Sequence, residues 1–186
     1  MILWLGLVIG LVAGMGWSRW RGHPYHPPTI NHIWLVIVGF LPQFLTVYLG
    51  NSRATIPDWL AAISIITSQL ILLVFAWLNR HLAGMSILIF GLVLNMAVMV
   101  VNGGFMPINP DIAERLVGSE QIALFEFGNR IGYKDILLPK NKTRLEWLAD
   151  RFLSPAEFPR QVAFSLGDIF IAFGAFWILA YQKTFD

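Results

Sequence analysis

Apolar residues along this chain fall into five long blocks, which polar and proline-containing segments separate. The blocks contain no lysine or arginine, and they hold two acidic residues, Asp58 near the start of one and Asp168 inside another. Each block is close to the roughly 20 apolar residues that an α-helix needs to cross a bilayer. The pattern therefore predicts five membrane-spanning helices. The blocks are Met1–Trp17, His32–Gly50, Ile56–Trp77, Met85–Val101 and Val162–Tyr181.

The predicted fold class is all-α, a polytopic bundle of about five transmembrane helices in which residues 1–186 form a single transmembrane domain. One segment, residues 102–160, is long enough to form structure outside the bilayer, between the fourth and fifth spans. Its aliphatic and aromatic content is higher than a disordered segment would have. We therefore expect it to form short amphipathic helices that lie on the membrane surface.

Capping patterns locate these surface helices. Asn109 is a favourable N-cap residue, with Pro110 at the first helical position and Gly118 as a stop. Two further segments, 143–146 and 154–157, have the spacing of a capping box, in which a serine or threonine precedes a glutamate by three residues. The patterns predict a helix start at each of the three places.

Short-loop charges indicate the orientation. If there are five spans, Arg19, Arg21, Arg80 and Lys183 lie on one side of the membrane, and the opposite short loop carries Arg53. Three arginines of the long segment, near a span end, count in the opposite direction. Because short loops dominate the positive-inside rule, we expect the N-terminus outside and the C-terminus in the cytoplasm.

The composition excludes several chemistries. The chain has no cysteine, so disulfides, thiolate catalysis and cysteine-ligated metal clusters are excluded. Its net charge is +2 and no run of lysine or arginine occurs, so nucleic acid is not an expected partner. Hydrolase, zinc-protease, phosphate-loop and dinucleotide motifs are missing from the sequence. The sequence thus favours a protein without enzymatic activity.

Glycines recur on one face of the first span. Gly6, Gly10 and Gly14 form two overlapping GxxxG units. A surface of glycines lets a neighbouring helix backbone approach closely. The neighbour is either another helix of this chain or a second subunit.

Asp168 is the main candidate for a functional polar group. Counted from the start of its apolar block it lies about 10 Å into the helix, where an ionisable side chain is costly unless it is paired. We expect Asp168 to accept hydrogen bonds from backbone N–H groups of the Gly103–Gly104 turn, with Ser165 and Asn102 assisting. The alternative is a proton-relay or substrate-binding carboxylate.

Three amides fall inside the predicted spans, Asn95, Gln43 and Gln69. Hydrogen bonds between such side chains hold membrane helices together, at about 0.6 kcal/mol each on average. Packing is the expected role of these residues, and a path for a polar solute is the alternative.

The histidines are candidates for a metal or pigment site. His23 and His26 are three residues apart, and His32 opens the second block, where it could act as an axial ligand. The proline-rich surroundings offer no nearby carboxylate, so ordinary surface histidines are the competing interpretation. Bound pigment or lipid is conceivable, and the sequence identifies no cofactor.

The order of three motifs resembles a known family. LVLNMAVMVVNGGFMPINP is followed by KNKTRLEWLADRF and then by SLGDIFIAFG. This order resembles the DUF5317 family, a domain of unknown function in bacterial membrane proteins. The resemblance implies a bacterial inner-membrane protein, implies no activity, and makes Asn102, Thr143 and Asp168 part of one structural unit. The matching positions are Asn95, Asn102, Gly103, Gly104, Met106, Pro107, Thr143, Leu148, Asp150, Ser165, Gly167 and Asp168.

Three functions are compatible with these features. The first is a non-catalytic integral membrane subunit or accessory protein of a larger bacterial complex, of respiratory or photosynthetic type, whose partners are the lipid bilayer and other membrane subunits. The second is a small-solute transporter or substrate-binding component that uses Asp168 and Asn95. A lipid-modifying enzyme is the third, and it is disfavoured because Asp168 has no evident acid–base partner. We expect the first.

Overall fold

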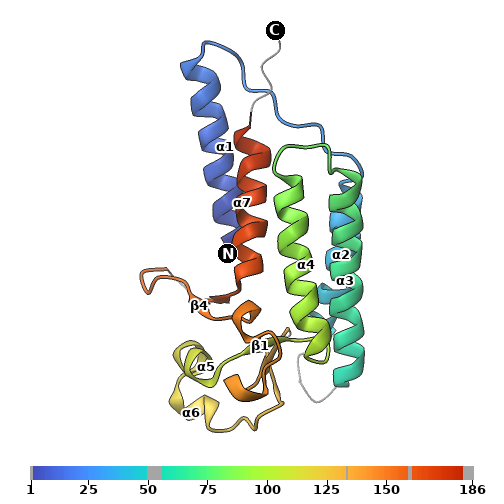
Figure 1. Cartoon of the computed structure of the whole chain (residues 1–186), viewed down its shortest axis with the longest axis vertical. Coiled ribbons are helices and arrows are strands. Elements are labelled where there is room, and N and C mark those ends of the chain that lie inside the picture. The colour runs from blue at the N-terminus through green and yellow to red at the C-terminus, as the bar shows by residue number, and fades with distance from the viewer. Residues whose placement is uncertain (1, 50–55, 133, 159–160, 182–186) are drawn as a thin grey trace.

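The computed structural model describes residues 2–49, 56–132, 134–158 and 161–181. The chain is mostly helical, as the sequence predicts, and five long apolar helices form its framework. A smaller unit, residues 102–165, covers one end of this framework and is called the cap below (Figure 1). The long helices are α1 (Ile2–Trp20), α2 (Trp34–Leu49), α3 (Asp58–Leu78), α4 (Met85–Val101) and α7 (Leu166–Ala180).

Neighbouring long helices contact one another in the order α1, α7, α4, α3, α2, and α2 lies behind α3 in the view of Figure 1. We call this arrangement the helix layer. Its outermost members each pack mainly against one neighbour, α1 against α7 and α2 against α3. The layer is therefore open, and much of the apolar surface of α1 and α2 is exposed.

Glycines explain how α1 and α7 approach each other. A Cβ atom at Gly10 would lie 2.5 Å from the carbonyl oxygen of Phe176, and Cβ atoms at Gly6 and Gly14 would overlap the backbone at Ala172 and Leu179. Because the contacts advance in the same direction along both helices, α1 and α7 are parallel. The GxxxG face of the first helix thus packs within the chain, which decides between the two partners that the sequence left open.

Small residues also join α7 to α4. A Cβ atom at Gly91 would lie 2.5 Å from the carbonyl oxygen of Gly167, and one at Gly174 would lie 2.6 Å from the backbone nitrogen of Leu88. The two helices are antiparallel, since the contacts run in opposite directions. Helix α7 is therefore packed closely on two sides and occupies a central place in the layer.

Side-chain hydrogen bonds join α2 to α3. Gln43 of α2 donates through Nε2 to Ser68 Oγ of α3 at 2.6 Å, and the Ser68 hydroxyl donates to the carbonyl of Gly39. Gln69 Oε1 is buried without a hydrogen-bond partner in the described part of the chain. Gln43 and Asn95 thus serve separate helix contacts, which agrees with a packing role for each and not with a common polar path.

The cap contains two small β-sheets, so the prediction of an all-α protein was wrong in this part of the chain. β1 (Met106–Ile108), β3 (Asp135–Leu137) and β2 (Arg130–Ile131) form a sheet in the order β1-β3-β2, in which β1 and β3 are parallel. β4 (Phe152–Leu153) pairs with β5 (Ala163–Phe164) in an antiparallel hairpin. Strands of two or three residues are too short to show an alternating pattern, and their pairing depends on contacts distant in sequence.

The surface helices of the cap are fewer than predicted. α5 (Pro110–Val117) begins and ends as expected, with the Asn109 side chain accepting a hydrogen bond from the Asp111 N–H at 3.0 Å. α6 (Ser119–Ile122) is a single turn, and two 3-10 turns, η1 (Lys140–Lys142) and η2 (Glu146–Leu148), follow. The helix start predicted at Thr143 was wrong, because η2 follows Leu145 and the Thr143 hydroxyl donates back to the carbonyl of Pro139.

The capping box predicted at Ser154 was also wrong. The described residues 155–158 form a turn and no helix, and the Ser154 hydroxyl instead accepts a hydrogen bond from the Val162 N–H at 3.0 Å. Ser154 is buried, and its own N–H donates to the carbonyl of Val162. The serine thus closes the β4–β5 hairpin, a role that the local spacing did not reveal.

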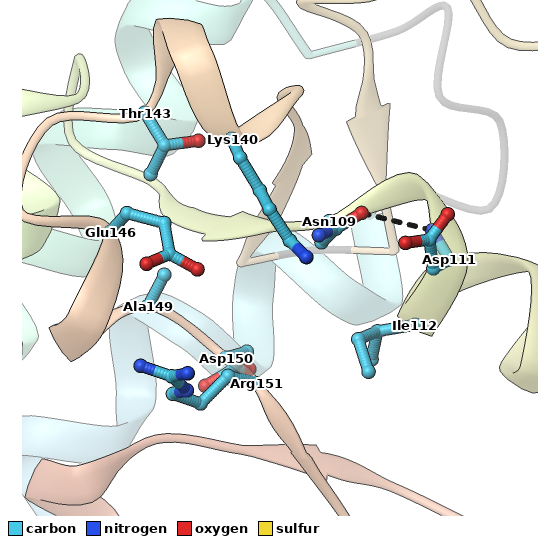
Figure 2. Close-up of a pocket in the computed structure, with 9 residues that line it drawn as sticks. All are labelled: Asn109, Asp111, Ile112, Lys140, Thr143, Glu146, Ala149, Asp150 and Arg151. Atoms are coloured by element: carbon cyan, nitrogen blue, oxygen red, sulfur yellow. Dashed lines mark hydrogen bonds between the residues drawn. The ribbon is translucent and has the colours of Figure 1, made fainter.

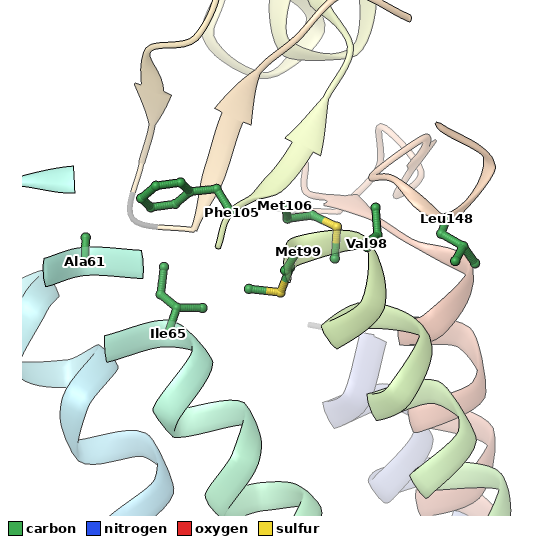
Figure 3. Close-up of a cluster of buried hydrophobic side chains, with 7 residues drawn as sticks. All are labelled: Ala61, Ile65, Val98, Met99, Phe105, Met106 and Leu148. Carbon is green, nitrogen blue, oxygen red and sulfur yellow. The ribbon is translucent and has the colours of Figure 1, made fainter. Parts of the chain in front are cut away.

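An apolar cluster fastens the cap to the layer. Side chains from α3, α4, the strand β1 and the turn η2 meet below the cap (Figure 3). Arg130 of β2 also links the cap to the start of α3. Its Nε lies 2.7 Å from Asp58 Oδ1, and its guanidinium donates a hydrogen bond to the carbonyl of Ile56. The cluster consists of Ala61, Ile65, Val98, Met99, Phe105, Met106 and Leu148.

Two helices of the described chain, α1 and α3, are long and apolar enough to cross a membrane. α4, α7 and the described part of α2 are apolar but shorter. The N-terminal ends of α1 and α7 lie at the cap end of the layer (Figure 1). Arg53 and Lys183, which contribute to the predicted orientation, lie outside the described residues.

Candidate functional site

Asp168 lies at the beginning of α7, where the helix meets the cap. Ser165 is the N-cap of this helix, and its hydroxyl accepts a hydrogen bond from the Asp168 N–H at 3.1 Å, while Asp168 Oδ2 accepts one from the Ser165 N–H at 3.1 Å. The two residues form a capping box, which is worth about 1 kcal/mol in a typical helix. The depth predicted for Asp168 was wrong, because the helix begins at Leu166 and the preceding apolar residues belong to β5.

Asn95 of α4 completes this group. Its Nδ2 donates to Asp168 Oδ1 at 2.8 Å, and its Oδ1 accepts a hydrogen bond from the Ser165 hydroxyl at 2.8 Å. Asn95 and Ser165 are 4 % and 0 % exposed. Gly167 allows this contact, because a Cβ atom there would overlap the Asn95 side chain. We call Asn95, Ser165 and Asp168 the polar link, since they join α4 to α7 with both Asp168 oxygens satisfied.

The turn after α4 is held by a different residue. Asn102 donates through Nδ2 to the carbonyls of Val98 and Arg144, at 2.7 and 2.8 Å, and accepts from the Arg144 N–H at 3.0 Å. The N–H of Gly104 donates to the carbonyl of Met99 at 2.7 Å. The expected hydrogen bonds from the Gly103–Gly104 turn to Asp168 were therefore wrong. The structure brings together Asn95, Ser165 and Asp168, and it separates them from Asn102.

Gly103 and Gly104 have φ angles of +79° and +90°, a backbone conformation that suits glycine. A Cβ atom at Gly104 would lie 2.6 Å from that of Ala62, so this glycine also allows the turn to rest on α3. Thr143 contacts the carbonyl of Pro139 instead of either polar group.

A charge cluster that the sequence analysis did not identify lies beside the polar link. Lys134 Nζ is 2.8 Å from Asp150 Oδ2 and 3.4 Å from Asp135 Oδ1. Asp150 is 1 % exposed, and its backbone N–H donates to the carbonyl of Pro107 at 3.1 Å, beside the sheet. Asp150 Oδ1 has no hydrogen-bond partner in the described part of the chain. Lys134, Asp135 and Asp150 are called the charge cluster below.

Burial and mutual repulsion shift the titration of this cluster. Burial, helped by the charges of Asp135 and Asp168, raises the pKa of Asp150 to about 7 against the opposing effect of Lys134. Burial also raises the pKa of Asp135. Burial alone would lower the pKa of Lys134, but the three carboxylates outweigh it and raise that pKa well above its ordinary value. The cluster can therefore take up or release a proton near neutral pH while Lys134 stays charged.

The local sequence contains little signal for this cluster. Lys134 immediately precedes β3, Asp135 is the first residue of that strand, and Asp150 follows them by 15 positions or more. They meet because β1 lies between the two segments, paired with β3 on one side and bridged to Asp150 on the other. The match of Asp150 to the family pattern was the one available indication.

A pocket of about 120 Å³ lies on the cap beside the charge cluster (Figure 2). Cofactor and drug-sized ligands occupy pockets of roughly 300–1,000 Å³, so this one has room for a few water molecules or a small ion. Its lining carries both charges in similar number and thus selects neither cations nor anions. The lining residues are Asn109, Asp111, Ile112, Lys140, Thr143, Glu146, Ala149, Asp150 and Arg151.

The candidate histidines lie at the end of the helix layer opposite the cap. His23 and His26 are exposed in the connection between α1 and α2, and His32 lies two residues before the start of α2 with a φ angle of +55°. Among the described residues, no three histidine, aspartate or glutamate side chains converge in a way that would hold a metal ion. A pigment-binding role for His32 stays a prediction.

The chain was compared with known proteins. No curated protein and no solved structure matches it. A family model described as a family of unknown function matches residues 28–180. This range includes the polar link, the charge cluster and the Asn102 contact. The chain therefore belongs to the DUF5317 family, as the order of its three motifs indicated.

Proposed function

We propose that this protein is a non-catalytic integral membrane subunit or accessory protein of a larger complex in the bacterial cytoplasmic membrane. The observation that carries the proposal is the open helix layer. Helices α1 and α2 each have one principal neighbour in the chain, and much of the apolar surface of α1 and of α2 up to Phe44 is exposed. Lipid or other membrane helices cover such a surface, and partner helices are what a subunit would supply.

Five membrane crossings suit this layer. α4 and α7 contain 17 and 15 residues, so they are about 25 and 22 Å long, and the cap and the interhelical connections extend them toward the full bilayer thickness. Five crossings place the N-terminus and the cap on one side and the C-terminus on the other. The positive-inside rule makes the cap side external.

The exposed face of α1 is the best candidate for contact with a partner. Its inner face is occupied, because Gly10 and Gly14 pack on α7. Between Trp4 and Met15 the outer face is wide and apolar, and its exposed members include Trp4, Val8, Ile9, Val12 and Met15. A helix held by one glycine-lined contact leaves this face available along its whole length.

The polar groups support a structural role more than a transport role. Asp168 and Asn95, which the transporter alternative requires, satisfy each other and Ser165. A transport site needs these groups to exchange partners with a solute. The same pairing offers no acid–base partner of the kind that a lipid-modifying enzyme requires.

Site-specific photocrosslinking in native membranes tests the proposal. A photoreactive residue at Val8 or Val12 of α1 should form an adduct with a second membrane protein, identified by mass spectrometry. The same variants crosslinked after purification in detergent should give the free chain, which controls for self-association. If neither these positions nor Ile37 and Phe44 of α2 yield a protein adduct in native membranes, the subunit proposal is wrong.

A further inference from the structure

We infer that the segment from residue 144 to residue 152 forms a headgroup platform, a surface that rests on the bilayer and binds anionic lipid headgroups. This inference uses the membrane placement of the helix layer proposed above, but it requires no partner subunit. The platform consists of Arg144, Leu145, Trp147, Arg151 and Phe152.

The ends of the platform are fixed at the boundary of the helix layer. At one end, Asn102, immediately after α4, binds both the N–H and the carbonyl of Arg144. At the other end, the Phe152 ring stacks on Phe164 with ring centroids 5.5 Å apart, two residues before α7 begins. The segment therefore lies level with the cap-side ends of α4 and α7 (Figure 1). In a membrane, this level is the lipid headgroup region.

The platform has an inner and an outer side. Leu148 is 3 % exposed and belongs to the apolar cluster beneath the cap (Figure 3), whereas Trp147 beside it is 53 % exposed. Leu145 and Phe152 are also exposed, at 40 % and 38 %. Tryptophan concentrates at membrane–water interfaces, because its ring is apolar and its N–H is polar. Exposed apolar side chains at this level are suited to the headgroup boundary and not to open water.

The backbone conformation at Leu145 determines which side chains of the platform face outward. Its φ and ψ angles are +53° and +46°, a left-handed conformation that a leucine rarely adopts. The Leu145 carbonyl accepts a hydrogen bond from the Leu148 N–H at 2.8 Å, which closes the turn. This turn directs Leu148 into the protein and leaves Leu145 and Trp147 outside.

Two arginines give the platform its charge. Arg144 and Arg151 are exposed, and neither guanidinium forms a salt bridge within the described chain. The Arg151 guanidinium lies 5.9 Å from the centre of the Phe152 ring, which holds it beside an exposed apolar side chain. Asp150 is buried and does not compete with lipid for these arginines, whereas Glu146 lines the same pocket as Arg151 and offsets part of its charge. Guanidinium groups bind phosphate oxygens through paired hydrogen bonds, so an anionic phospholipid suits the surface.

The first experiment measures how deeply Trp147 of the platform lies in the bilayer. The chain has no cysteine, so a single cysteine at Trp147 can carry a spin label in the full-length protein. The purified protein is reconstituted in nanodiscs of phosphatidylcholine and phosphatidylglycerol. The label should lie in the headgroup region, whereas a label at Leu124, which is 83 % exposed on the cap, should lie in water. Equal water accessibility at both sites would overturn the inference.

The second experiment measures lipid selectivity by counting phosphatidylglycerol molecules retained in native mass spectra. Arg144→Gln and Arg151→Gln together should weaken phosphatidylglycerol retention by about tenfold or more relative to phosphatidylcholine. Arg115→Gln, which removes an exposed charge from α5, is the control and should change retention little. Equal retention of both lipids by the wild type overturns the preference for anionic headgroups. Protection of Trp147 by a co-purifying protein in native membranes, with no contact in nanodiscs, assigns the surface to a protein instead.

Because both experiments use the isolated chain, their failure leaves the subunit proposal intact. Conversely, the lack of a crosslinked partner at α1 does not affect the platform. The two proposals can thus be rejected separately.

Discussion

Asn95 and Asp168 are hydrogen-bonded across the contact between α4 and α7, with the Asn95 Nδ2 donating to Asp168 Oδ1 at 2.8 Å. They are 73 positions apart, and the whole cap lies between them in sequence. Because α4 leads into the cap and α7 leads out of it, this hydrogen bond joins the two helices at the points where the chain enters and leaves the cap. It also places the Asp168 charge close enough to raise the pKa values of all three members of the charge cluster.

Replacement of Asp168 should loosen the cap in proportion to the hydrogen bonds lost. Both Asp168 oxygens accept hydrogen bonds, and asparagine retains one acceptor. We expect Asp168→Asn to lower the unfolding free energy by about 1–2 kcal/mol, and Asp168→Leu by more, since leucine leaves two donors unpaired. Thermal unfolding in detergent and limited proteolysis of the cap would measure this. A fully protected Leu variant that has lost a transport activity would support the functional-carboxylate alternative.

Gly10→Leu should separate α1 from α7. The substituted side chain would meet the Phe176 backbone, and helix backbones cannot move aside as a flexible side chain can. We expect a loss of roughly 2 kcal/mol or more, in the range for overpacked sites. Gly16→Leu is the matched control, because a Cβ atom there has no neighbour within 4 Å. Equal thermal stability of the two variants would contradict the α1–α7 packing.

Stability should decrease as pH rises toward neutrality, partly because of Asp150. The pKa of Asp150 is about 7 in the folded protein and near its ordinary value in the unfolded chain. The folded state therefore binds a proton more tightly, and this advantage is present at low pH and lost as pH rises from about 4 to 7. Each unit of pKa difference corresponds to about 1.4 kcal/mol. Asp150→Asn should show a shallower decline between pH 4 and pH 7 in chemical denaturation, and parallel curves would exclude this role.

Asn102→Asp should release residues 144–148 from the end of α4. Asparagine donates to the Arg144 carbonyl and accepts from its N–H, whereas an ionised aspartate can accept but not donate. Amide hydrogen exchange across this segment should become faster in the variant. Asn129→Asp, at an exposed position of the cap, introduces the same charge and should leave the exchange of this segment unchanged.

Reporter fusions test the number and direction of the crossings. Fusions after Gln182 and within the segment 120–129 should report opposite sides of the membrane, with the former in the cytoplasm. The reasons are an odd number of crossings and the arginines of the short loops. If both fusions report the same side, five crossings are excluded. The reverse assignment would keep the number and invert the orientation.

Much of the helix layer could be predicted from the sequence, because apolar content and helix-breaking residues are local signals. The predicted blocks overlap all five long helices, and Asn109, Pro110 and Gly118 mark α5 correctly. The GxxxG face was recognisable as a contact surface, since a small residue every fourth position aligns on a helix. The helix that fills this surface could not be read from the spacing.

The cap was less predictable. Threonine and serine three positions before a glutamate suggested two helix starts, but the Thr143 and Ser154 hydroxyls bind backbone groups of a turn and a hairpin. Local spacing shows which hydrogen bonds a side chain can make, and the fold decides between them. The short strands depend on pairing partners up to 29 positions away, as between Met106 and Asp135.

The sequence by itself determined the helical class, the polar residues that need partners and the family to which the chain belongs. The tertiary structure decided which partners they have. Asp168 pairs with Asn95 and not with the glycine turn, and Lys134 meets Asp150 because a strand brings two distant segments together. Burial and charge pairing depend on positions in space, so they arise only once the chain has folded.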